Sequence, residues 1–405
     1  MSKSTFFTGQ PIFNQLISLI PKHIISNASL KYNADRYCKK FMAYDHLVTM
    51  LYTSLEKCTS IREVTTGLLA CFHKLNHLGL RNVPRRSTLS DANSRRSSLF
   101  FQNVYHELYN YYYRNSPDSL EEKDVKKRLF LVDSTTISLF NEVMKGMGTH
   151  AINGRKKGGA KAHMMVKAEN MVPEFVQITE AIKNDKDIFP FLKLAPGAIV
   201  VLDKGYNSYA QFHKWDQEQV IWVTRMAETA YQVLVDSRPL SSDEKSLGVI
   251  ADDVVNLGRP SNKSTQSICA RRIGFKDLTS GKKFNFITND MKFKASTVAN
   301  IYKQRWQIEL LFKRLKQNYP LQYFLGDSEN AITIQIWCAL ITDLLLNIIK
   351  RVLKRNWSYS NLRGMIRLHL MNYINLIDFL NSPEDSLNNY KEKMLELEPN
   401  LFSSS

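Results

Sequence analysis

Cysteine is scarce in this sequence, and no two cysteines are spaced as in a CxxC motif. The 405 residues include five cysteines, an odd number. This pattern excludes a disulfide framework and an ordinary zinc ribbon. One metal site remains as an alternative. Its four ligands would be Cys58, Cys71, His73 and His77, although the Cys-x-His spacing fits no common zinc module. Packing between helices is the favoured interpretation of these four residues.

Long uninterrupted hydrophobic stretches are also missing. The first ten residues, MSKSTFFTGQ, contain no apolar segment of the kind found in secretory signals. The most apolar stretch, residues 332–349, is interrupted by Gln335, Asp343 and Asn347. We therefore expect a soluble, cytoplasmic protein with no membrane partner.

Charge of one sign is in excess. Lys and Arg number 55 against 38 Asp and Glu, which gives a net charge of +17 and a pI near 9.5. The excess is shared between the two parts of the chain, with 19 basic against 10 acidic residues up to position 128 and 36 against 28 beyond it. Because no single tail carries the charge, the folded body itself is expected to face a polyanion. The two usual polyanions are nucleic acid and an anionic membrane surface, and with no membrane partner expected, nucleic acid is favoured.

The texture of the sequence changes along the chain. Residues 1–114 show 3.6-residue apolar periodicity and few glycines, which predicts helices, and the polar residues 115–128 predict a linker. Short apolar strands with intervening helical patterns follow, and this alternation predicts an α/β region. A β-rich tract from about residue 228 to 283 contains a predicted hairpin turn at Thr279-Ser280-Gly281, and the chain is helical again from about residue 295.

A basic segment near residues 83–97, VPRRSTLSDANSRRS, has the pattern of a turn followed by a helix. Pro84 cannot continue a preceding helix, and Ser87 or Thr88 can cap the next one. The segment is either a DNA-binding helix or a solvated basic face. Its candidate DNA contacts are Arg85, Arg86, Arg95 and Arg96.

A second basic segment, GRKKGGAKAH at residues 154–163, lies between early strands. Its glycines allow close backbone approach to phosphate, and it lacks the GK[ST] ending of a P-loop. The alternative is an exposed flexible turn. The candidate phosphate contacts are Arg155, Lys156, Lys157 and Lys161.

Three acidic residues are candidates for an active site. Asp133 closes the apolar run LFLVD and Asp203 closes AIVVLD, so both carboxylates are expected at the carboxyl edge of a sheet. The third acid, Glu309, lies in IYKQRWQIELLFKRLKQ. At 100° per residue, Tyr302, Arg305, Glu309 and Lys316 share one face of a helix. The alternative is an ordinary amphipathic helix with a basic solvent face. It explains the lysines, but it does not require an aromatic residue, an arginine, an acid and a lysine on the same face.

The spacing Tyr302-x2-Arg305-x3-Glu309-x6-Lys316 resembles the YREK signature of bacterial insertion-sequence transposases of family four. Asp133 in LVDSTTISLF and Asp203 in VVLDKGYNSY resemble the two aspartates of that family's DDE triad. Trp306 and the segments IWVTR and ITND also resemble sequences found in this family. The resemblance extends over roughly residues 84–320.

This resemblance implies an α/β fold with an RNase H-like mixed-sheet core and a β-rich insertion, flanked by helical regions. The expected organisation is a helical DNA-binding domain at 1–114, a linker at 115–128, the first part of the core at 129–226, the insertion at 227–283, the second part of the core with the Glu-bearing helix at 284–330, and a C-terminal helical region at 331–405.

The resemblance also implies a chemistry. Two Mg²⁺ ions, with Mn²⁺ as a possible substitute, would serve the attacking and leaving oxygens of an in-line displacement at a phosphodiester. Asp133 would hold both ions, and Asp203 and Glu309 one each. Contacts to DNA near the cut would come from Tyr302, Arg305, Trp306 and Lys316.

The implied function is a cut-and-paste transposase that binds the terminal inverted repeats of double-stranded DNA, cuts them and joins the 3′-OH ends to target DNA. A homodimer in the DNA complex and a bacterial, nucleoid-associated location are expected. Two alternatives stay open: an RNase H-like nuclease that does not join ends, and a transposase-derived DNA-binding protein without catalysis. Relatives form a DNA hairpin with the help of a tryptophan in the insertion; residues 226–305 contain none, so Tyr231 or Phe275 is expected to support the flipped base.

Overall fold

The computed structural model describes residues 9–114, 125–138, 159–258 and 267–385. They form two compact units, a helical unit from the residues before 118 and after 313, and an α/β unit from residues 118–313. The regions expected at 1–114 and 331–405 therefore lie in the same unit. Local patterns in the sequence cannot show this, because the two regions are separated by the whole α/β unit.

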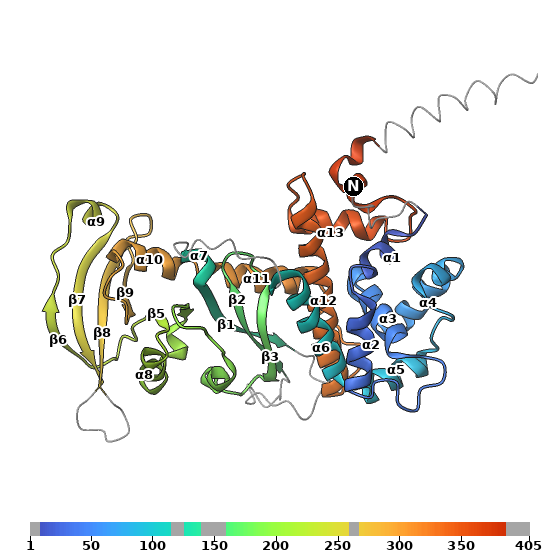
Figure 1. The fold of residues 1–405 in the computed structure, drawn as a ribbon, viewed down its shortest axis with the longest axis horizontal. Helices are drawn as coiled ribbons and strands as arrows, with labels where there is room; N and C mark the ends of the chain where they lie inside the picture. The colour runs from blue at the N-terminus through green and yellow to red at the C-terminus, as the bar shows by residue number, and fades with distance from the viewer. Residues whose placement is uncertain (1–8, 115–124, 139–158, 259–266, 386–405) are drawn as a thin grey trace, which may run out of the picture. The chain divides into compact units, whose positions relative to one another are not determined.

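The helical unit begins with short helices and is completed by the C-terminal segment (Figure 1). Its elements are α1 (Ile12–Ile17), α2 (Lys22–Lys31), α3 (Ala43–Glu56), α4 (Ile61–Ala70), the 3₁₀ helix η1 (Phe72–Leu78), α5 (Arg86–Arg95), α6 (Ser98–Tyr109), the π-helical turn η2 (Asn110–Arg114), α12 (Glu329–Val352), α13 (Tyr359–Leu368) and α14 (Leu376–Asn381).

Helix α12 is the core of the helical unit. It is long and apolar enough to cross a membrane by composition alone, but 94% of its most apolar window is buried inside the protein, where α3, α5 and α6 pack against it. Its polar residues are buried with partners: Gln335 donates to the carbonyls of Pro320 and Tyr323, and Asp343 pairs with Arg314 at 2.7 Å. A buried polar side chain with such partners is the mark of a packed protein interior.

Hydrogen bonds to backbone carbonyls join the N-terminal and C-terminal segments of the helical unit. Phe13 N–H donates to the Leu370 carbonyl at 2.8 Å, and the Gln15 amide donates to the Ile374 carbonyl at 2.6 Å. Near α3, the buried Arg363 guanidinium donates to the carbonyl of Leu55 at 2.6 Å. These bonds join residues more than 300 positions apart in the chain.

The α/β unit is built on one nine-stranded sheet in the order β3-β2-β1-β4-β5-β9-β8-β7-β6. β1 pairs antiparallel with β2 and parallel with β4, which continues parallel into β5. This five-strand part is the RNase H-like core and confirms the expected fold class. Its strands are β1 (Leu129–Ser138), β2 (Gly159–Lys167), β3 (Pro173–Glu180), β4 (Ile199–Leu202) and β5 (Ile221–Arg225).

The insertion extends the same sheet. β9 (Lys283–Thr288) pairs antiparallel with β5 on one side and β8 (Ile268–Lys276) on the other, and β7 (Val249–Leu257) and β6 (Gln232–Ser237) follow outward. The expected hairpin is present, with Lys276 opposite Lys283. A short helix, α9 (Ser242–Ser246), connects β6 to β7.

Aromatic packing fixes the middle of the sheet. β4 reads IVVL and is buried on both faces, as expected of a central parallel strand. On one face, η3 (Asp185–Phe191), η4 (Lys204–Tyr206) and α8 (Tyr209–Gln217) cover a cluster in which Phe212 stacks on Trp222 with ring centroids 4.1 Å apart. This cluster holds β4 and β5 in place, and with them the strand end that carries Asp203.

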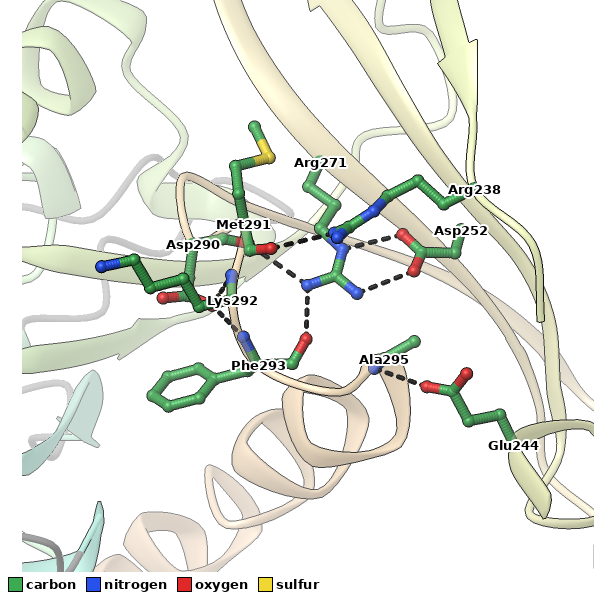
Figure 2. Close-up of polar contacts among 9 residues, drawn as sticks. All are labelled: Arg238, Glu244, Asp252, Arg271, Asp290, Met291, Lys292, Phe293 and Ala295. Carbon is green, nitrogen blue, oxygen red and sulfur yellow. Dashed lines mark hydrogen bonds and ion pairs between the residues drawn. The ribbon is translucent and has the colours of Figure 1, made fainter. Parts of the chain in front are cut away.

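An arginine in the insertion anchors the turn that leads into α10 (Ala295–Lys303). Figure 2 shows Arg271 of β8 forking onto both carboxylate oxygens of Asp252 at 2.7 Å and donating to the Phe293 carbonyl at 2.6 Å. In the same view, Arg238 donates to the Met291 carbonyl, and Glu244 accepts the backbone N–H of Ala295. The insertion thereby fixes where α10 starts.

Candidate active site

The sheet register brings the two aspartates together. Val132 of β1 is opposite Leu202 of β4 in a parallel pair, so Asp133 and Asp203 are the next residues on neighbouring strands. Asp133 accepts the backbone N–H of Ser134 at 2.8 Å, and its side chain is 16% exposed. Asp203 caps η4 at the end of β4. Both carboxylates therefore meet where the parallel pairing of β1 and β4 ends. Asp203 follows β4 as predicted, but Asp133 lies inside β1, which continues to Ser138 along β2, so the prediction that Asp133 ends its strand is corrected.

Arg305 joins the third acid to the first. Its Nη1 lies 2.9 Å from Oδ2 of Asp133, and its Nη2 lies 2.7 Å from Oε1 of Glu309. The guanidinium is 16% exposed, and its Nε has no hydrogen-bond partner among the described residues. One cation is thus shared between two acids from segments 172 residues apart.

Converging acids perturb one another. Burial raises the pKa of Asp133 to about 6; the Ser134 N–H and Arg305 oppose this rise, and the charges of Asp203 and Glu309 add to it. The Coulombic effect of Asp203 on Asp133 places its carboxylate in the same electrostatic environment as the other two. Three carboxylates and one arginine leave this region short of positive charge.

The four signature residues do not share one continuous helix, which corrects the sequence prediction. Tyr302 lies in the last turn of α10, Arg305 lies in a turn, and Glu309 and Lys316 are on α11 (Trp306–Asn318). At the break, Arg305 N–H bonds to the Tyr302 carbonyl and Ile308 N–H to the Arg305 carbonyl, so the bonds tighten to the i to i+3 pattern. No proline or glycine marks this break in the sequence.

The other residues of the signature have different surroundings. The Tyr302 ring packs on Phe286 with centroids 4.6 Å apart, and the Arg305 guanidinium lies 5.8 Å from the Tyr302 ring centre. Trp306 is 60% exposed. Lys316 is exposed and follows Glu309 along α11.

One acid near the site was missed. Asp185, at the start of η3, accepts the Ser134 hydroxyl at 2.7 Å and pairs with Lys161 at 3.3 Å. Lys161 also donates to the Lys183 carbonyl, so the ammonium expected at a phosphate has protein partners here. The remaining members of that basic segment, Arg155, Lys156 and Lys157, lie outside the described residues.

The N-terminal arginines divide into two kinds. Arg85 and Arg86 are exposed at the start of α5, and Arg95 is exposed and pairs with Asp91 at 2.7 Å. The prediction that Arg96 lies on an exposed basic face with the other three arginines is corrected, because this residue is 6% exposed and donates to the carbonyls of Ala34 and Phe41. The helix also starts at Arg86, with Arg85 in the capping position expected of Ser87 or Thr88.

The aromatic residues expected to support a flipped base also differ. Phe275 is 3% exposed and covered by the Lys303 ammonium, 4.6 Å from its ring centre, so it has no free face for a base and that prediction is corrected. Tyr231 is 44% exposed.

The donor set suits a hard cation. Carboxylate oxygens are the ligands that Mg²⁺ prefers. The pKa of Asp133 is raised first by burial and, to a smaller extent, by the charges of Asp203 and Glu309, which a bound cation would offset. Within the described residues no three His, Cys, Asp or Glu side chains lie close enough to hold a metal ion as they stand. Arg305 occupies the space between two of the three acids. The alternative cluster of Cys58, Cys71, His73 and His77 likewise forms no such group.

Comparisons with known proteins identify a family and several relatives. The family described as "Transposase DDE domain" matches residues 124–344, and a "Domain of unknown function (DUF4372)" matches residues 8–81. A Sinorhizobium fredii protein named as transposase y4zB is 31% identical over 66% of this chain and 72% of its own length. Proteins named as transposases of IS5377 in Geobacillus stearothermophilus and IS4SA in Synechocystis are 28% and 24% identical, over 54% and 76% of this chain and 56% and 83% of their own lengths.

A piggyBac transposase synaptic complex with hairpin DNA aligns with a TM-score of 0.42 at 11% identity, covering 91% of this chain and 80% of that one. The family match spans more than half of the 405 residues, and it includes all three acids. The chain therefore belongs to the DDE transposases of bacterial insertion sequences, enzymes that cleave DNA and transfer its strands.

Proposed function

We propose that this transposase cuts and pastes its element with Asp133, Asp203 and Glu309 as its catalytic and metal-binding residues. The observation that carries the assignment is the Arg305 fork, which contacts Asp133 and Glu309 at 2.9 and 2.7 Å. Strand transfer needs its acids close together, and the sheet register places Asp203 beside Asp133.

The family uses divalent metal ions; for this chain we propose two Mg²⁺ ions, with Mn²⁺ as a substitute. When bound, such ions activate the attacking oxygen and stabilise the leaving oxygen of a phosphodiester. The chain supplies the three carboxylates that hold them. Arg305 pairs with two of these acids, Asp133 and Glu309, and its planar fork would also suit a pair of phosphate oxygens.

DNA contacts are proposed in two places. Near the cut, Tyr302, Arg305, Trp306 and Lys316 would hold the strand, and the 60% exposure of Trp306 supports this role. In the helical unit, the exposed Arg85, Arg86 and Arg95 would contact backbone phosphates of the terminal inverted repeat. Phosphate contacts of this kind fix position and do not read sequence.

We further propose that the second strand is cut through a hairpin, with Tyr231 as the support for the flipped base. Its 44% exposure favours it over the buried Phe275. A homodimer on the paired DNA ends and a cytoplasmic, nucleoid-associated location complete the proposal, since two ends must be joined together.

The test uses three variants and a labelled end. Asp133→Asn, Asp203→Asn and Glu309→Gln should each abolish Mg²⁺-dependent cleavage of a labelled inverted repeat while its binding stays nearly intact. Glu218→Gln, which changes an exposed acid on the same unit, is the matched control. Retained cleavage in any one variant removes that residue from the site.

Joining of the labelled end to a target plasmid separates the alternatives. A transposase joins, a nuclease only cuts, and a non-catalytic protein only shifts the DNA in a gel. A fold-back product of twice the strand length on a denaturing gel is expected for the hairpin route; its absence while both strands are cut would rule that route out.

A further inference from the structure

A basic cavity in the helical unit is lined by none of the residues assigned above to catalysis. It has a volume of about 640 Å³ and is formed by the loop between α2 and α3 together with α5. This is the size range of pockets that hold a small ligand. Its rim carries four exposed cations: Arg36, Lys39, Lys40 and Arg95.

The acids near this rim are already engaged. Asp35 points back into the loop, where it accepts the Ser29 hydroxyl and the backbone N–H of Ala43. Asp91 pairs with Arg95 at 2.7 Å. The cations of the loop itself, Arg36, Lys39 and Lys40, are exposed and give it a net positive charge, which suits an anion such as phosphate.

Tyr37 projects from the same rim. Its side chain is 89% exposed, the Arg36 guanidinium lies 4.8 Å from its ring centre, and its backbone φ is +60°. A bulky residue rarely adopts this left-handed conformation, and such strain concentrates at binding sites. An exposed aromatic ring beside cations is a stacking platform for a base.

The buried Arg96 holds the cavity in shape. Its guanidinium donates to the Ala34 carbonyl at one end of the loop and to the Phe41 carbonyl at the other, both at 2.8 Å. Its Nη1 has no hydrogen-bond partner among the described residues, although the residue is 6% exposed and lines the cavity. A buried N–H without a partner is costly unless a ligand completes it.

We propose that this cavity binds one unstacked nucleotide of the DNA end. The phosphate lies on the cationic rim, the base stacks on Tyr37, and Arg96 Nη1 donates to the nucleotide. The proposal rests on the proposed binding of inverted repeats by the helical unit. It adds a contact that depends on a single nucleotide position.

The key variant is Tyr37→Gly, measured by binding to a fluorescent duplex of the inverted repeat that flanks the gene. Glycine adopts positive φ freely, so the melting temperature should stay equal or rise. Loss of the stacked ring should weaken binding by about 5- to 100-fold. Tyr37→Phe should bind like the wild type.

Tyr373→Ala is the matched control, because Tyr373 is 43% exposed and also lies beside a cation, Lys74, at 5.2 Å in the same unit. It should leave binding unchanged.

An abasic scan locates the nucleotide. The duplex is made with one abasic site at each position in turn, and each duplex is titrated with wild type and Tyr37→Gly. At one position the two proteins should bind equally, because the base that stacks on Tyr37 is already gone. Equal affinities on the intact duplex, or a Tyr37 effect of the same size at every abasic position, would overturn the nucleotide pocket. In those cases wild-type end binding leaves the proposed function standing, whereas failure of the wild type to bind the repeat contradicts both proposals.

Discussion

Arg271 and Arg305 each form a forked ion pair in the α/β unit, and the difference between them separates a structural role from a chemical one. Arg271 is 2% exposed, faces one acid, Asp252, and donates its remaining N–H groups to backbone carbonyls. Arg305 is 16% exposed, contacts Asp133 and Glu309, and leaves its Nε without a partner among the described residues. The first pair is balanced in charge and hydrogen bonds. The second has more acid than one cation can neutralise, which is where a further cation can enter.

Removing each arginine should sharpen this comparison most. Arg271→Met should lower the free energy of unfolding by about 3 to 5 kcal/mol, since it leaves the Asp252 charge buried and unpaired. Arg305→Met should lower it by no more than about 1 kcal/mol, because that pair is partly solvated. Urea unfolding of both variants measures the difference.

The double variant Arg271→Met with Asp252→Leu is the control for the buried pair. It should recover much of the lost stability, because no uncompensated charge remains. Equal losses in the two single arginine variants would show that the two pairs are equivalent and that the comparison fails.

A pH titration extends the comparison to a buried neutral group. His46 is fully buried, and burial, with a contribution from the charge of Arg96, lowers its pKa to about 3. The unfolded chain, with a pKa near 6.5, binds the proton more readily than the folded one, so His46 contributes stability above pH 6.5 that is lost as the pH falls toward 3. Between these two pH values, the contribution of His46 to the slope of the free energy of unfolding against pH should approach about 1.4 kcal/mol per pH unit.

His46→Gln should remove this slope, and unfolding curves between pH 4 and 7 measure it. His46 bonds to Asn93 at 2.8 Å, so the variant is also expected to be less stable at pH 7. A slope that is the same in the variant and the wild type would assign the acid sensitivity to other groups.

The smallest expected effect concerns exposed charge. Arg85→Ala with Arg86→Ala should flatten the plot of log K against log salt by about 0.9 for each phosphate that these side chains neutralise in the wild type. Lys22→Ala with Lys354→Ala changes two exposed lysines outside the predicted DNA-binding segment and should leave the slope unaltered. If the arginine variant also keeps its slope, these side chains are a solvated face.

Local patterns in the sequence were enough to predict the α/β character and the acids that follow apolar runs, but not that β1 continues past Asp133 to Ser138. Asp133 and Asp203 each follow an apolar run, and a parallel pair places such residues side by side. The break between Tyr302 and Trp306 could not be predicted, because no proline or glycine marks it and Arg305 is held by Asp133, far away in the sequence.

Partners that are distant in sequence explain the other differences. Arg96 looks like its neighbour Arg95 until the fold brings the carbonyls of Ala34 and Phe41 around it. Asp185 sits in an ordinary polar stretch and acquires its place only when η3 packs beside β1. Such contacts need the tertiary fold, which local periodicity does not contain.

The α/β unit, residues 118–313, interrupts a helical unit whose core helix α12 begins at Glu329. On the ribosome, the sheet and all three acids emerge before α12 exists to cover the apolar faces of α3 and α6. Domains usually fold in the order of their synthesis. Here the first residues to be synthesised are the last to be buried. A nascent chain that stops before residue 329 therefore has a complete sheet but exposes the apolar faces of its N-terminal helices, which makes it prone to aggregate.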